Sequence, residues 1–140
     1  METGSLPIDQ SPDIKVTRYW FAAACTAGMA VVTDLSTTTT TTGNTLAVGS
    51  FAKKSPATAD LPGVLGYLVN TVTAGSWGDV QQSGVMTGVT CNAAVVAGDA
   101  LCTEATAGSS RTYVAGTDGN KTATALTSYS GGTCTVLIGR

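Results

Sequence analysis

The chain has 140 residues and a net charge of -2, and only 11% of its residues are charged, where about 25% is usual for a soluble domain. It lacks histidine, the commonest general base of enzymes, and its few basic residues cannot neutralise a nucleic-acid backbone. No apolar run approaches the roughly 20 residues that a membrane span needs, and the first residues lack the pattern of a signal peptide. We therefore expect a structural, assembly-type protein that is made in a cytoplasm.

Residues 1–14 are predicted to form a flexible N-terminal arm, because they contain two prolines and little apolar material. Ile8 and Ile14 are the isolated apolar residues of this arm. Two interpretations stay open for it. The arm is either a disordered tail or a segment that orders against a partner by adding a strand to an exposed sheet edge.

Residues 15–140 are predicted to form a single all-β domain, because threonine, valine and alternating apolar residues favour strands. A strand begins at Lys15, and both of its faces are partly apolar. A hairpin is expected through the threonine run 37–42 and the Gly43-Asn44 pair that follows it. The other predicted strands cover residues 30–33, 64–72, 79–82, 85–91, 99–103, 111–115, 122–127 and 133–138. Residues 53–63 are expected to form a loop, with a short helix-like turn near 52–60.

The sequence contains a weak internal repeat. Ala27–Asp34 and Ala97–Glu104 share the pattern Ala-Gly-x-Ala, two small or aliphatic residues, threonine and an acid. The physical interpretation is a tight turn that delivers the chain into a strand, with glycine supplying the positive φ. Chance similarity in a chain rich in alanine, glycine and threonine remains the alternative.

The four cysteines, Cys25, Cys91, Cys102 and Cys134, are scattered and form no Cys-x-x-Cys motif. Without histidine, this spacing is not that of a zinc site, and we predict no metal and no cofactor. Two interpretations stay open: buried, reduced cysteines that act as small apolar residues, or a cross-strand disulfide between Cys91 and Cys102.

No catalytic constellation is apparent, so we expect no enzyme activity. A serine nucleophile would have no histidine beside it. Asp79, Asp99 and Glu104 come nearest to a carboxylate cluster in sequence, and we interpret them as turn and surface residues. The aromatic residues Tyr19, Trp20, Tyr67 and Trp77 are either a sugar-binding face or, more commonly, core and interface anchors.

Short motifs follow one another in a fixed order between Leu61 and Ile138. The motifs are Gly63-Val64-Leu65-Gly66, Ala74-Gly75, Ser83-Gly84-Val85-Met86-Thr87-Gly88-Val89, Val95-Val96-Ala97-Gly98-Asp99-Ala100-Leu101 and Thr135-Val136-Leu137-Ile138. This order resembles the small capsid decoration (cement) proteins of tailed bacteriophages, and the likeness covers roughly residues 15–140. The chain departs from that family in its cysteines, its threonine run and its long arm.

The resemblance implies a compact small β-barrel or β-tulip-like domain that binds the outer surface of an icosahedral head, commonly as a homotrimer, and stabilises it against internal DNA pressure. The implied partners are the major capsid protein and further copies of the chain, with no direct nucleic-acid or membrane contact. The implied location is the virion, after synthesis in the host bacterial cytoplasm. We place the capsid contact on Ile8, Ile14 and Val16, and the subunit contact near Trp77. The alternatives are a head-fibre or tail component and a carbohydrate-binding β-sandwich module.

Overall fold

The computed structural model describes residues 14–37, 46 and 49–139. This part of the chain is all-β, as predicted, and it contains no helix that is long and apolar enough to cross a membrane. The strands are β1 (Lys15–Phe21), β2 (Ala30–Thr33), β3 (Phe51–Lys54), β4 (Val64–Leu68), β5 (Ser76–Thr90), β6 (Ala100–Thr103), β7 (Ser110–Thr112), β8 (Ala123–Ala125) and β9 (Thr133–Ile138). The predicted arm lies outside the described residues except for Ile14, and most of the predicted hairpin at 37–48 also lies outside them.

The first five strands form a small closed barrel, which confirms the predicted architecture. Their order is β1-β3-β2-β4-β5, and β5 pairs back with β1 to close the ring. The barrel is closed partly by a parallel pair, β1 with β3, whereas its other pairs are antiparallel. Its core consists of the buried residues Tyr19, Phe21, Cys25, Val31, Ala52, Leu68, Val72 and Val80.

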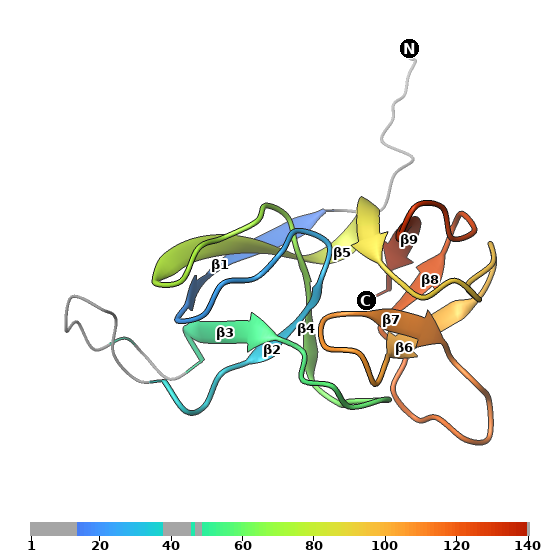
Figure 1. Cartoon of the computed structure of the whole chain (residues 1–140), viewed down its shortest axis with the longest axis horizontal. Helices are drawn as coiled ribbons and strands as arrows, with labels where there is room; N and C mark the ends of the chain where they lie inside the picture. The colour runs from blue at the N-terminus through green and yellow to red at the C-terminus, as the bar shows by residue number, and fades with distance from the viewer. Residues whose placement is uncertain (1–13, 38–45, 47–48, 140) are drawn as a thin grey trace, which may run out of the picture.

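The long strand β5 continues into a second five-stranded group with the order β5-β9-β8-β6-β7. An isolated parallel bridge between Cys91 and Ser110 connects the end of β5 to β7. We call β1–β4 with residues 76–82 unit A, and residues 83–90 with β6–β9 unit B. Figure 1 shows unit A at the left and unit B at the right, with β5 running from one into the other. The fold is thus two similar groups of strands that share one strand.

The two units repeat each other strand by strand, because β2, β3 and β4 have the same pairing registers as β6, β7 and β8. Val31 pairs with Lys54 in unit A, and its counterpart Leu101 pairs with Thr112 in unit B. The other matching pairs are Ala30–Tyr67 with Ala100–Thr124, Val31–Gly66 with Leu101–Ala123, and Phe21–Ala52 with Cys91–Ser110. The weak sequence repeat is therefore part of a much longer structural repeat.

The predicted Ala-Gly turns precede β2 and β6, and each contains a glycine with positive φ. The N–H of Gly28 donates to the Leu68 carbonyl at 2.8 Å, and the N–H of Gly98 donates to the Ala125 carbonyl at 2.8 Å. A side-chain contact repeats as well: Ala27 N–H to Thr71 Oγ1 at 3.0 Å matches Ala97 N–H to Ser128 Oγ at 3.1 Å. These shared bonds confirm the turn interpretation of the repeat.

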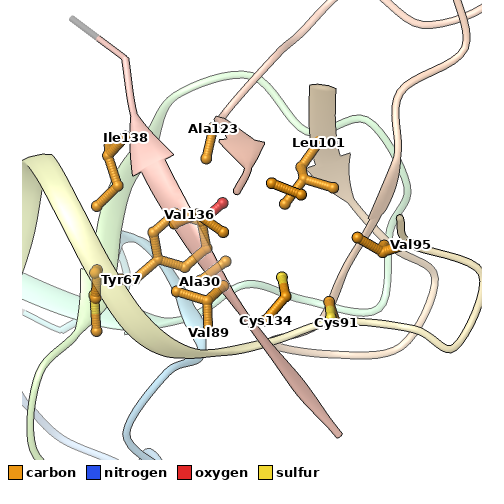
Figure 2. Close-up of a cluster of buried hydrophobic side chains, with 12 residues drawn as sticks. Ala30, Tyr67, Val89, Cys91, Val95, Leu101, Ala123, Cys134, Val136 and Ile138 are labelled. Atoms are coloured by element: carbon orange, nitrogen blue, oxygen red, sulfur yellow. The ribbon is translucent and has the colours of Figure 1, made fainter. Parts of the chain in front are cut away.

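The core of unit B contains two residues of unit A. Ala30 and Tyr67 are fully buried in a cluster with Met86, Val89, Cys91, Val95, Leu101, Ala123, Ala125, Cys134, Val136 and Ile138. Figure 2 shows the Tyr67 ring beside Val136 and Val89. The Tyr67 hydroxyl and Thr122 Oγ1 share a hydrogen bond of 2.7 Å. The two units are therefore packed together through a common apolar cluster.

Three element predictions are wrong in detail. The helix-like turn near 52–60 is wrong, because Phe51–Lys54 is strand β3, paired with both β1 and β2. The strand predicted at 64–72 ends at Leu68. The separate strands predicted at 79–82 and 85–91 are one strand, β5, because Gly84 adopts a φ of 90° and lets the strand continue with new partners.

Candidate interaction surface

The ribbon formed by β1 and β5 has an apolar inner face and a mixed outer face. Tyr19 and Phe21 point into the core of unit A, so the alternate residues of β1 point outward. Across the ribbon, Arg18 is opposite Asp79, and Trp20 is opposite Trp77. Arg18 Nε lies 3.3 Å from Asp79 Oδ1 in an exposed ion pair. The outer face therefore presents charged and aromatic side chains next to each other.

Trp20 and Trp77 meet edge to face on this outer surface. Their ring centroids are 5.5 Å apart and their planes are inclined by 79°. Trp77 is 45% exposed, whereas Trp20 is only 7% exposed, and its ring N–H has no hydrogen-bond partner among the described residues. Trp77, the predicted subunit-contact residue, is therefore a half-exposed aromatic side chain supported by a buried one. That geometry suits an interface anchor.

The predicted capsid-contact residues lie at the start of the same ribbon. Ile14 is 61% exposed and Val16 is 48% exposed, whereas Ile8 lies outside the described residues. The N–H of Lys15, between the two, donates to Ser83 Oγ at 3.1 Å, which places them at the middle of β5. Val85, two residues further along β5, is also exposed. We call Ile14, Val16 and Val85 the junction patch.

Sequence reasoning did not identify Val85 as a surface residue. Its strand was predicted to begin at this residue, after a break at Gly84, so nothing connected it to Ile14 and Val16. If residues 76–90 had been treated as one strand with alternating faces, Val85 would have been placed on the same face as Trp77. The other aromatic residues, Tyr19 and Tyr67, are buried and contribute no sugar-binding face.

An acidic cluster beneath β6 and β7 has a structural explanation. Asp60, Cys102 and Asp118 bring ligand-type atoms within 4.8 Å of one another. The Asp118 carboxylate accepts hydrogen bonds from Arg111 at 2.7 and 2.8 Å and from the Val114 N–H at 2.8 Å. The Asp60 carboxylate accepts hydrogen bonds from the N–H groups of Gly119 and Asn120 at 2.9 and 2.8 Å. The Asp60 carboxylate therefore holds a loop of unit A to a loop of unit B, whereas Asp118 holds β7 to the loop that follows it.

The three acids that were interpreted as turn and surface residues have separate local partners. Asp79 pairs with Arg18, as described above. Asp99 Oδ2 accepts from the Val96 N–H at 3.0 Å and from Thr112 Oγ1 at 2.9 Å. Glu104 Oε1 accepts from Asn92 Nδ2 at 2.8 Å. These contacts fix loops and strand ends.

All four cysteines are free and buried. Cys102 pairs with Arg111 across the β6–β7 hairpin, and its thiol lies 3.7 Å from Asp118 Oδ2. Cys91 instead contacts Cys134. Burial raises the pKa of both thiols; the contact raises the pKa of Cys134 further, whereas it partly offsets the rise in the pKa of Cys91. The alternative of a Cys91–Cys102 disulfide is therefore wrong, because the fold places these residues against different neighbours.

A polar groove of about 320 Å³ lies where the two units meet. It is lined by Leu61, Gly63, Val64 and Gly66 of unit A and by the segment 119–122 of unit B, together with Ile138. Its cation, Lys121, lies with Nζ 5.0 Å from the ring centroid of Tyr113. Among the described residues that line the groove none is aromatic, so these residues offer no stacking platform for a sugar ring.

No family model matches the chain, and a search of curated proteins finds no match either.

Proposed function

We propose that the chain is a non-catalytic structural protein that decorates the outer surface of a tailed-bacteriophage head. The order of its short motifs and its small β-barrel architecture support this role. The observation that carries it is the junction patch, where Ile14 and Val16 expose apolar side chains next in sequence to residues 1–13 and Val85 exposes one on the paired strand β5. An exposed group of this kind at the start of a strand is suited to contact with another protein.

The mechanism is mechanical. Packaged DNA loads the joints between capsid subunits, and a protein that bridges such a joint lowers the free energy of the intact shell. Each copy needs only a modest contact, because a lattice of copies acts together. The junction patch supplies the contact to the major capsid protein, and Trp77 supplies a contact between copies. Synthesis takes place in the bacterial cytoplasm, and the mature location is the virion surface.

The experiment measures copies per head in purified particles, by quantitative gel densitometry against the major capsid protein. One variant lacks residues 1–13, and a second carries Ile14→Asp with Val16→Asp. The matched control is Leu35→Asp, because Leu35 is 77% exposed and lies outside the junction patch. We expect the wild type and the control to decorate heads fully, and both patch variants to lose binding while they keep the thermal stability of the domain.

Full occupancy by both patch variants would contradict the assigned contact. A wild-type ratio of a few per cent of the major capsid protein would indicate a head-fibre, neck or tail component. Complete absence from particles would exclude a virion role.

The half-exposed Trp77 is the observation that favours the second candidate, a carbohydrate-binding module. Tryptophan fluorescence across a glycan panel tests that candidate separately. A saturable change that Trp77→Ala removes would support it.

A further inference from the structure

We infer that residues 5–10 of the N-terminal arm fold back onto the open edge of β1 as an added strand, within the same chain. The backbone groups of Val16 and Arg18 form this edge. The inference concerns the protein free in solution, and it does not rest on capsid binding.

Strand β1 is paired on both sides only at its end. It pairs with β5 along its whole length, whereas its described pairing with β3 is limited to Trp20 and Phe21. The Trp20 N–H donates to the Ser50 carbonyl at 2.9 Å, so the backbone groups of Trp20 point away from β5. Alternate residues of a strand direct these groups to the same side, so those of Val16 and Arg18 also point away from β5.

The backbone groups of this edge are unpaired and accessible. Those of Val16 and Arg18 have no hydrogen-bond partner among the described residues. Asp79, opposite Arg18 on β5, likewise faces away from β1, because its carbonyl accepts from the Val69 N–H at 2.9 Å. Val16 is 48% exposed, and Arg18 is exposed as well. The edge therefore presents two donors and two acceptors in line, which an antiparallel strand can pair with.

The corresponding edge in unit B is covered by another part of the chain. Thr90 is the counterpart of Trp20, and its N–H donates to the Gly28 carbonyl at 2.9 Å. Gly28 also lies against the Gly88 carbonyl, so the turn before β2 lies along this edge of β5. The part of β1 before Trp20 has no such cover among the described residues. The repeat therefore indicates an edge that accepts a further segment of chain.

The sequence directly before β1 suits this edge. Residues 1–13 lie outside the described residues, and they end where β1 begins. Pro12-Asp13 are residue types of a reverse turn, and a chain that turns there runs back along β1. Before the turn, the apolar Leu6 and Ile8 alternate with Ser5, Pro7 and Asp9, which is the pattern of a strand with one apolar face.

Charge, proline and attachment select this segment as the occupant. Lys15 and Arg18 are exposed cations on β1. Residues 1–13 have no lysine or arginine and contain three acids, Glu2, Asp9 and Asp13. Proline is found in edge strands, and an added strand that contains Pro7 would become the new edge. Direct attachment to β1 gives the arm a high effective concentration at this edge, which a second copy lacks.

Hydrogen exchange measured residue by residue with NMR tests the inference, by comparing the full chain with a variant that lacks residues 1–13. The amides of Val16 and Arg18 should exchange at least about tenfold more slowly in the full chain. The Thr17 amide is the internal control, because it faces β5 and should exchange equally in both proteins. Equal exchange of Val16 and Arg18 in the two proteins would overturn the inference.

A charge reversal and a dilution series identify the occupant. Lys15→Glu should reduce the protection factors of Val16 and Arg18 about threefold, whereas Lys53→Glu, at an exposed lysine of β3, should leave them unchanged. The protection should be the same at all protein concentrations. Equal effects of the two lysine variants, or protection that rises with concentration and so reports pairing with a second copy, would overturn the inference. Copies per head, measured separately, report on the proposed function.

Discussion

Arg111 and Asp118 form a two-bond ion pair that connects β7 to the loop after it, with Nη1–Oδ2 and Nη2–Oδ1 distances of 2.8 and 2.7 Å. The Arg111 hydrogen bonds hold the pKa of Asp118 at about 2, below its ordinary value of 3.8. Because the folded-state pKa is lowered, the carboxylate stabilises the fold fully above pH 3.8, and this contribution is lost as the pH falls towards about 2.

The first prediction concerns acid stability. Asp118→Asn should lower the unfolding temperature at neutral pH, and the difference from the wild type should shrink as the pH falls from 4 to about 2. Thermal unfolding followed by circular dichroism at a series of pH values measures this difference. A gap that stays constant down to the lowest pH would contradict the assignment of the ion pair.

The second prediction uses the internal repeat as its own control. Gly28→Ala should destabilise the protein by about 3 kcal/mol, because the residue has positive φ and its new Cβ would collide with the Gly88 carbonyl. Gly98→Ala, at the corresponding turn, has open space around the new Cβ and should cost only about 1 kcal/mol. Urea unfolding of both variants gives the comparison. Equal losses would mean that the Gly28–Gly88 contact contributes little.

The third prediction concerns the hydroxyl of Tyr67. Tyr67→Phe should destabilise the protein by about 1 kcal/mol, because it removes a buried hydrogen bond to Thr122. Tyr129→Phe is the control, since Tyr129 is exposed and should be neutral. Chemical unfolding measures both. An unchanged Tyr67→Phe variant would show that this hydrogen bond between the units is not stabilising.

The fourth prediction concerns the thiols. Burial raises the pKa of Cys25 and Cys102 to about 11 and that of Cys134 to about 12, so little thiolate exists near pH 8. A thiol reagent should react very slowly with the native protein and should titrate four thiols after denaturation. Rapid reaction of one native cysteine would show that its part of the barrel opens readily.

The fold class was predictable because strand periodicity is local. The last strand, Thr133–Ile138, was predicted with its observed bounds, since buried and partly exposed residues alternate along it. β3 was not predictable in this way, because Phe51-Ala52-Lys53-Lys54 shows no alternation and becomes a strand through its antiparallel pairing with β2 and its parallel pairing with β1. Parallel partners are distant in sequence and leave no short-range signal.

The repeat was only partly visible in the sequence for a related reason. The Ala-Gly turns have the same residue types in both units, because each turn needs a glycine to adopt positive φ. Elsewhere the shared features are backbone hydrogen bonds, which permit different side chains, so Tyr67 and Thr124 occupy corresponding places without resembling each other. The exposure of Ile14, Val16 and Trp77 could be expected from the sequence, whereas the exposure of Val85 could not.

The pairing of β5 also brings the ends of the barrel strands together. Lys15, the first residue of β1, pairs with Ser83, and Ile138, the last residue of β9, pairs with Gly84. A peptide attached to either end of the domain would leave the molecule from the same place. A short linker between these ends should permit a circular permutation whose new termini open in a distant loop. A tether pulled from both ends would load one point of β5 and would not stretch the two units apart.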